Sequence, residues 1–140
     1  MRIYIAAPFF NERQLEIVKS LEGWLDYLGI DYFSPRSQGK PLKDMSGKEL
    51  LKARGEVFQN NVDNMEACSH MIACVEEKDT GASFEIGYFF KSGKPIIMYS
   101  EKIGRINVML AEAAFSICDD PFKLSAAING RYSITINELI

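Results

Sequence analysis

Histidine is nearly absent from this chain, which has one, His70, among 140 residues. A metal site built from several histidines is therefore excluded, and a Ser-His-Asp triad is disfavoured. Cysteine is scarce as well, because Cys68, Cys74 and Cys118 are odd in number and form no C-x-x-C pair. This usage indicates reduced, buried thiols in a cytoplasmic protein rather than a disulfide framework or a zinc site.

Long apolar runs and cofactor motifs are missing too. No stretch approaches the roughly 18 apolar residues of a membrane helix, and the first residues have the pattern of a strand rather than of a signal peptide. The chain has neither G-x-G-x-x-G nor G-x-x-x-x-G-K-[ST], so binding of a dinucleotide or a nucleoside triphosphate is not supported. Its net charge of −3 does not favour a sequence-independent grip on nucleic acid. We expect no cofactor, no metal ion, no membrane contact and no nucleic-acid partner.

The composition predicts a single domain over residues 1–140. Hydrophobic residues make up 47% of the chain and charged residues 25%, which is ordinary for a soluble globular protein. A chain of this length buries a core but does not readily enclose a deep pocket on every side. Any chemistry must therefore use carboxylates, amides, hydroxyls or backbone groups.

Strand and helix patterns alternate along the sequence. Short β-rich or continuously apolar runs predict strands at residues 2–7, 30–33, 70–75 and 95–99. Apolar residues at helical spacing, with Asn11 and Ser46 as N-caps, predict helices at residues 12–28, 47–65, 82–91, 107–115 and 120–129. The alternation predicts a three-layer α/β/α fold around a mostly parallel five-stranded sheet of the flavodoxin or Rossmann type.

Two carboxylates stand near one predicted strand end. Ligands of such sheets bind beyond the carboxyl ends of the strands, which gathers segments 6–10, 76–81 and 99–107 around one crevice. Asp79 lies in the loop that leaves a buried strand, and Glu85 lies in about the first turn of the next helix. With one residue on the loop and one on the helix, both carboxylates can point into the crevice.

The two carboxylates suit different chemical roles. A glutamate near a helix N-terminus is stabilised as an anion, as a nucleophile requires, while an aspartate flanked by other carboxylates suits a proton donor. Such a pair can cleave a glycosidic bond through a covalent intermediate. Simple capping gives the same pattern and stays open as an alternative. Gly81 fits both, either by adopting a positive φ or by letting the backbone approach a ligand.

Several longer stretches carry a family resemblance: IYIAAPFFNERQ, NNVDNMEACSHMIACVEEKDTGASFEIGY, GKPIIMYS and INVML. Together they resemble the nucleoside 2-deoxyribosyltransferases over roughly residues 3–113, with D-x-G-x-x-F-E-x-G-Y as the core motif. The resemblance implies transfer of 2'-deoxyribose between purine or pyrimidine bases, with retention, through a deoxyribosyl-glutamate intermediate. The implied partners are 2'-deoxynucleosides and free nucleobases, and no cofactor is implied.

The resemblance also implies a role for each matched residue. Glu85 matches the nucleophile, Asp79 the carboxylate that exchanges a proton with the base, and Tyr4 the tyrosine that positions the nucleophile. Without the resemblance, Tyr4 is interpreted as a core aromatic. Asn107 and Met109 match residues that come from a neighbouring subunit, the asparagine binding the sugar 5'-hydroxyl, although Asn107 alone is also a plausible helix N-cap. We therefore expect a homo-oligomer, a dimer or larger, whose subunits share their sites.

A base pocket is implied in the same way. Ala6, Pro8 and Phe9 fall where the family builds one wall of this pocket. Some members carry an aspartate about two turns before the third strand that helps to hold the base. Asn61 stands at that position, with Asp63 two residues later. An amide both donates and accepts hydrogen bonds, whereas a carboxylate only accepts, so the base preference stays open.

Two other functions remain open. One is an N-glycoside hydrolase of the same fold, in which water replaces the second base and the substrate is a 2'-deoxynucleoside or its 5'-monophosphate. Candidates for binding a 5'-phosphate are Arg36, Lys40, Lys43 and Arg105, although basic residues in loops are usually just solvated. The other is a non-catalytic nucleotide-sensing module, which would bind a ligand without turnover.

Overall fold

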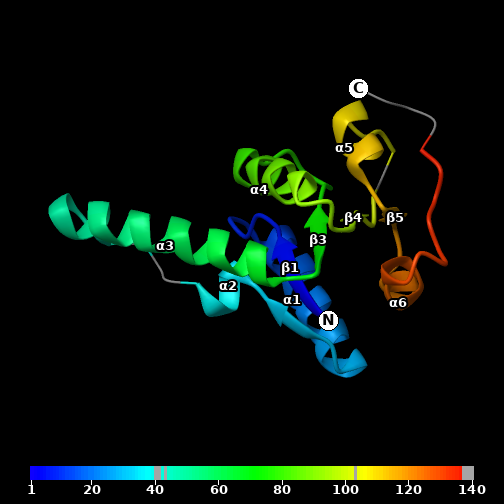
Figure 1. Ribbon diagram of the computed structural model, residues 1–140, viewed down its shortest axis with the longest axis horizontal. Helices are drawn as coiled ribbons and strands as arrows, with labels where there is room; N and C mark the ends of the chain where they lie inside the picture. The colour runs from blue at the N-terminus through cyan, green and yellow to red at the C-terminus, as the bar shows by residue number, and fades with distance from the viewer. Residues whose placement is uncertain (40–41, 43, 103, 137–140) are drawn as a thin grey trace.

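A parallel sheet forms the centre of the molecule (Figure 1). In the computed structural model, which describes residues 1–39, 42, 44–102 and 104–136, the strands are β1 Arg2–Ala6, β2 Asp31–Phe33, β3 His70–Cys74, β4 Ile96–Tyr99 and β5 Ser116–Cys118. The described strands form one 5-stranded sheet in the order β2-β1-β3-β4-β5, and every neighbouring pair is parallel. The predicted fold class is confirmed.

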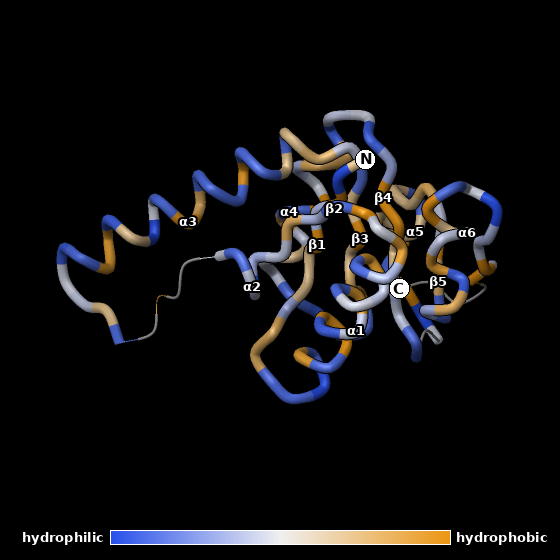
Figure 2. Tube along the Cα trace, turned by 90° about the horizontal axis from the view of Figure 1, so that it is seen from below, coloured by the Kyte–Doolittle hydropathy of each residue, from blue (hydrophilic) through white to orange (hydrophobic). Residues whose placement is uncertain are grey.

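Helices cover both faces of this sheet. Their bounds are α1 Glu12–Leu28, α2 Pro35–Gln38, α3 Gly47–Ala67, α4 Thr80–Lys91, α5 Val108–Ala113 and α6 Leu124–Ile128, with a 3-10 turn η1 at Pro121–Lys123. Alternate strand residues separate two cores, because successive side chains point to opposite faces. Ile5 packs with α1 and α6 on one face, while Tyr4 packs with α3, α4 and α5 on the other. Figure 2 shows the apolar residues concentrated along the central strands.

Local sequence signals fix the ends of α1 as predicted. The side-chain oxygen of Asn11 accepts a hydrogen bond from the backbone N–H of Gln14 at 2.9 Å, which satisfies one of the unpaired amides of the first turn. Gly29 ends the helix with a φ of 69°, a left-handed conformation that glycine adopts without steric penalty. The helix therefore runs exactly between its two caps.

The long helix α3 extends well beyond the sheet (Figure 1). Its periodic apolar residues predict a buried face, yet Ala53 and Met65 are its buried residues and Phe58 is 56% exposed. Its C-terminal end is held by Lys94, whose ammonium group donates to the carbonyl oxygens of Met65 and Cys68 at 3.0 and 2.7 Å. A cation there pairs with the negative end of the helix dipole. The helix is thus anchored at one end and leaves much of its apolar side open.

Several elements differ from the prediction, and the helix predicted at 120–129 is divided into η1 and α6. No element is predicted between the strand at 30–33 and the helix at 47–65, but this segment contains the short helix α2, held by hydrogen bonds from Ser34 and Arg36 to the buried carboxylate of Glu22. The helix predicted at 107–115 ends at Ala113, and β5 follows at Ser116, where no strand is predicted. Helix α4 begins two residues early.

The described residues also bear on two simpler expectations. Cys68, Cys74 and Cys118 are all buried and free, as predicted. Among the helices that the structure describes, none combines the length and the apolar character needed to span a bilayer.

Candidate active site

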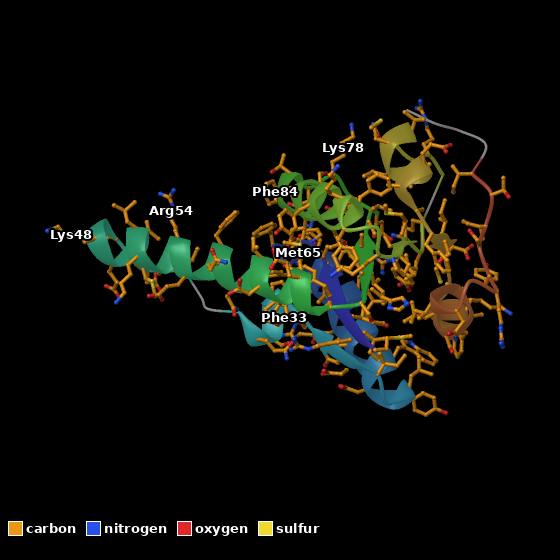
Figure 3. All side chains as sticks on the ribbon, viewed as in Figure 1. Phe33, Lys48, Arg54, Met65, Lys78 and Phe84 are labelled. Atoms are coloured by element: carbon orange, nitrogen blue, oxygen red, sulfur yellow. The ribbon has the colours of Figure 1, made fainter. Side chains whose placement is uncertain are left out.

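A groove of about 640 Å³ lies between α3 and α4, within the size range of small-molecule sites. Figure 3 shows Phe84 of α4 close to Met65 at the end of α3, with Arg54 farther out along α3. The lining of the groove is mostly apolar and includes Leu51, Arg54, Phe58, Asn61, Met65, Gly81, Phe84 and Glu85. A carboxylate in such a wall marks the place where chemistry can occur.

Glu85, in the wall of this groove, contacts Tyr4 of β1. Tyr4 is fully buried in β1, where its ring stacks on Phe33 with the ring centroids 5.5 Å apart. Its hydroxyl donates a hydrogen bond to Oε2 of Glu85. The pair joins the first strand to the fourth helix across the sheet surface and fixes the orientation of the carboxylate. The predicted proximity of Tyr4 and Glu85 is therefore observed.

Burial dominates the electrostatics of Glu85. Loss of water raises the pKa of its carboxyl to about 7, while the hydrogen bond from Tyr4 acts to lower that pKa and the charge of Asp79 acts to raise it. Burial and the negative charge of Glu85 raise the pKa of Tyr4 well above its ordinary value, so Tyr4 stays protonated and donates. Glu85 is thus poised to change its charge near neutral pH.

The expectation that a helix N-terminus stabilises the Glu85 anion is wrong. Helix α4 begins at Thr80, so Glu85 lies in its second turn rather than its first. The free amides and most of the dipole effect are confined to the first turn. Glu85 instead lies half-buried at the groove wall, and desolvation has the largest effect on its ionisation.

Asp79 caps the helix that carries Glu85. Its Oδ2 accepts a hydrogen bond from the backbone N–H of Ala82 at 2.7 Å, so the capping interpretation is correct for this residue. Capping does not exclude a second role, because the carboxylate is close enough to influence Glu85 electrostatically. Gly81 has no positive φ, which rules out that explanation for it. It lines the groove, and a Cβ there would lie 3.4 Å from Oδ2 of Asp79.

Asn61 presents an unusual polar group to the groove. Its Oδ1 is buried and has no hydrogen-bond partner among the described residues. A buried carbonyl oxygen without a partner costs about 1–3 kcal/mol, which a donor from a ligand would recover. Asp63 is exposed instead, and its carboxylate accepts a hydrogen bond from Gln59 at 2.7 Å. Of these two predicted base-binding residues, Asn61 lines the groove and Asp63 does not.

Comparison with known proteins assigns the family. The family model described as "Nucleoside 2-deoxyribosyltransferase" matches residues 3–123 of the chain. The chain belongs to the nucleoside 2-deoxyribosyltransferase family. The solved structure of a 2-deoxyribosyltransferase from Bacillus psychrosaccharolyticus is 30% identical, with a TM-score of 0.78 over 89% of this chain and 90% of that one.

Two further proteins are similar to this member of the deoxyribosyltransferase family, one in sequence and one in fold alone. A Thermofilum pendens protein named "Putative 2'-deoxynucleoside 5'-phosphate N-hydrolase 1" is 28% identical over 113 residues, which cover 79% of this chain and 76% of that protein. The structure of a conserved protein from Enterococcus faecalis is 14% identical with a TM-score of 0.57, over 98% of this chain and 91% of that one, and shows the shared fold alone. Family membership supports an enzyme rather than a non-catalytic sensing module.

Tyr4 and Asp79 do not line the groove themselves but act on Glu85, which does. Five further residues matched to the deoxyribosyltransferase family also do not line the groove of their own chain. Ala6 is buried on the Tyr4 side of the sheet, Pro8 lines a separate small cavity, and Phe9 is exposed. Asn107 caps α5, with its Oδ1 accepting from the N–H of Met109 at 2.8 Å. Met109 itself is 74% exposed. Their roles in binding remain predictions.

The outer wall of the groove was not among the predicted site residues. The predicted crevice draws on segments 6–10, 76–81 and 99–107, but among their described residues only Gly81 lines the groove. Most of its lining comes from α3, including Arg54 and Phe58. The sequence signal for this wall is the helical spacing of apolar residues in α3, which continues beyond the part of the helix that the sheet covers.

Two of the four candidates for binding a 5'-phosphate, Arg36 and Arg105, lie within the described residues. Arg36 is engaged with the buried carboxylate of Glu22, which also raises the pKa of its guanidinium. Lys40 and Lys43 lie outside the described residues. Arg105 is exposed and does not line the groove, whereas Arg54, which was not a candidate, does.

Proposed function

We propose that this protein transfers 2'-deoxyribose from a 2'-deoxynucleoside to a free nucleobase, with retention, through a deoxyribosyl-Glu85 intermediate. The observation that carries the proposal is the hydrogen bond from Tyr4 to Glu85 at the wall of the groove. It orients one oxygen of a desolvated carboxylate and leaves the other to react. Family membership and the similarity to the Bacillus psychrosaccharolyticus enzyme support the same reaction.

The proposed reaction has two displacement steps. In the first, Oε1 of Glu85 forms a bond to the anomeric carbon, the bond from that carbon to the base nitrogen breaks, and its electron pair leaves with the base. Asp79 gives the departing base a proton. In the second step a new base attacks the same carbon, Asp79 takes back a proton, and the carboxylate of Glu85 is released. Two inversions at one carbon give net retention.

The groove offers a subsite for the base next to Glu85. The rings of Phe58 and Phe84 are 6.0 Å apart and both side chains are largely exposed, so an aromatic base can replace water on their surfaces. The unpartnered Oδ1 of Asn61 lies in the same wall and can accept a hydrogen bond from an N–H group of the base. We place the base among these three side chains.

A product assay tests the reaction. The protein is incubated with deoxyinosine and free adenine, and the products are separated by chromatography. We expect deoxyadenosine and free hypoxanthine, together with a deoxyribosyl adduct in denaturing mass spectrometry that is absent from Glu85→Ala. Free deoxyribose without a new nucleoside would reject transfer and favour hydrolysis.

Hydrolysis of a 2'-deoxynucleoside 5'-monophosphate is the second candidate. It is favoured by the similarity to the Thermofilum pendens protein, whose name describes that activity. The same Glu85 and Asp79 would act, with water taking the place of the second base. Repeating the assay with deoxyinosine 5'-monophosphate, with and without adenine, separates the candidates, because a hydrolase releases deoxyribose 5-phosphate whether or not a base is supplied.

We also propose that Asn107 and Met109 complete the site of a neighbouring subunit. Their exposed place at the start of α5, away from the groove of their own chain, agrees with this. Glu85→Ala and Asn107→Ala are each expected to be nearly inactive when assembled alone. In mixed dimers, one of the two sites has both native residues, so random mixing should restore about a quarter of the wild-type activity.

The complementation is measured after the two variants are unfolded together and refolded, with each variant refolded alone as the control. A wild-type protein that is monomeric at assay concentrations, or a mixture no more active than its components, would show that the site is not shared.

A further inference from the structure

Glu76 joins three separate chain segments at the carboxyl edge of the sheet. Both of its carboxylate oxygens bind Arg13 of α1, with Nε to Oε2 at 2.9 Å and Nη2 to Oε1 at 3.0 Å. The backbone N–H of Glu101, in the turn after β4, donates to the same carboxylate. The start of α1, the β3–α4 loop and the β4–α5 connection thus meet at one side chain.

A second residue of α1, Gln14, forms hydrogen bonds with both the loop after β1 and the loop after β3. Gln14, which is 9% exposed, accepts a hydrogen bond from the backbone N–H of Phe10 through Oε1 at 2.8 Å. Its Nε2 donates to Oε2 of Glu77, also at 2.8 Å. Arg13 and Gln14, which are neighbours in α1, thus bind Glu76 and Glu77, which are neighbours in the β3–α4 loop. Because Gln14 also binds Phe10, the loop after β1 is linked to the loop after β3.

The geometry of the Glu76 pair distinguishes it from an ordinary surface ion pair. Exposed ion pairs contribute little to stability, because water screens them and the side chains lose freedom. Here the Glu76 side chain is 10% exposed and the contact with the guanidinium is bidentate, which adds directional restraint. Hydrogen bonds from Arg13 lower the pKa of Glu76, so the pair persists over the neutral range.

The connections that meet at Glu76 carry proposed site residues but are not themselves part of the sheet. The β3–α4 loop ends at Asp79, and the β4–α5 connection leads to Asn107. Loops outside the ladder of backbone hydrogen bonds are the parts of a fold that open most easily. A shift of about 1 Å in a reacting group can reduce a rate by about 100-fold.

We propose that Glu76 is a positioning residue, which, through Arg13 and the backbone of Glu101, fixes the start of α1, the β3–α4 loop and the β4–α5 connection relative to one another. This inference rests on the proposed function for its catalytic consequence, because the group it positions is the proton donor Asp79. It assigns Glu76 no contact with substrate.

The test compares Glu76→Ala and Glu76→Gln with Asp31→Ala. Asp31 forms an ion pair with Arg2 at 3.1 Å at the opposite edge of the sheet, so its removal is a matched control. In the deoxyinosine and adenine assay, Glu76→Ala should lower kcat about tenfold and change KM less, since a misplaced proton donor affects mainly the transition state. Glu76→Gln, which keeps an acceptor for the Glu101 N–H, should fall between that variant and wild type, and Asp31→Ala should match wild type.

Hydrogen exchange in the free proteins supplies a readout that does not depend on turnover. Glu76→Ala should speed exchange at residues 8–11 and 100–102 as well as in its own loop, with Asp31→Ala unchanged there. If the wild type and Asp31→Ala transfer deoxyribose and Glu76→Ala matches them in kcat, the proposal is overturned and the function stands. If the wild type has no activity, the function fails, and exchange that increases only within residues 76–79 overturns the proposed linkage as well.

Discussion

Replacement of Glu85 by glutamine is expected to abolish turnover while making the folded protein more stable above neutral pH. An amide cannot act as the attacking carboxylate, so transfer in the deoxyinosine and adenine assay should fall by about 10⁴-fold or more. The hydroxyl of Tyr4 can still donate to the side-chain oxygen of glutamine, so the packing of the pair is preserved. Loss of activity therefore reports on chemistry rather than on folding.

The gain in stability follows from the ionisation of Glu85. Its pKa rises from 4.5 to about 7 in the folded protein, mainly through burial. The unfolded chain therefore loses this proton at lower pH than the folded one, and stability falls as the pH rises from about 4.5 to about 7. At about 1.4 kcal/mol per pH unit, the ionised carboxylate destabilises the fold by about 3 kcal/mol at pH 8. Glutamine does not ionise and escapes this effect.

The measurement is the melting temperature of both proteins between pH 5 and pH 8. The two should agree near pH 5, and the variant should melt several degrees higher at pH 8. Glu112→Gln, which changes an exposed glutamate on α5, serves as the control and should show no such growing difference. A difference in melting temperature that is the same at both pH values would contradict the raised pKa, and retained turnover would exclude Glu85 as the nucleophile.

Much of the fold follows from local sequence signals. Asn11 and Gly29 cap α1 where their chemistry predicts, and the apolar runs that become β1 and β3 are predicted almost to the residue. The strand β5 gives no comparable signal, because Ser116–Cys118 is too short to show a period. Its place is set by backbone pairing with β4, as in the 2.8 Å bond from Phe115 to Ile96, which depends on tertiary structure.

The sequence predicts that Tyr4 and Asp79 lie near Glu85, but it does not predict the surroundings that set the ionisation of Glu85. The sequence brings Glu85 near Asp79, but the start of α4 depends on which residue caps it. Once Asp79 caps the helix, Glu85 falls in the second turn, and its surroundings come from β1 rather than from its own helix. The groove wall on α3 shows a similar limit, because the period of its apolar face does not reveal whether the sheet extends far enough to cover it. Figure 2 shows hydrophilic and hydrophobic residues alternating along α3.

Tyr4→Phe is expected to move the pH dependence of the reaction rather than to abolish it. The hydrogen bond from Tyr4 acts to lower the pKa of Glu85, and its removal should raise that pKa above 7. A hydrogen bond to a charged group contributes about 1.5–3 kcal/mol, which corresponds to roughly one to two pH units. At pH 7 about half of the wild type carries the ionised nucleophile and much less of the variant does, so kcat/KM should fall about 5- to 50-fold.

The profile of kcat/KM from pH 5 to pH 9 checks this expectation. In the wild type, kcat/KM should rise through about pH 7 as Glu85 ionises, and in Tyr4→Phe the rise should occur at higher pH. Tyr27→Phe, which removes the hydroxyl of an exposed tyrosine, is the matched control and should follow the wild type.

The height of the alkaline plateau separates two roles of the Tyr4 hydroxyl. If it only favours ionisation, the variant should regain the wild-type rate once the pH is high enough to ionise Glu85 fully. If it also orients the carboxylate, a constant deficit should remain at that pH, because ionisation alone does not restore the direction of attack. If kcat/KM of Tyr4→Phe rises at the same pH as in the wild type, the hydrogen bond from Tyr4 does not lower the pKa of Glu85. Burial and Tyr4 together would then not explain the ionisation of Glu85.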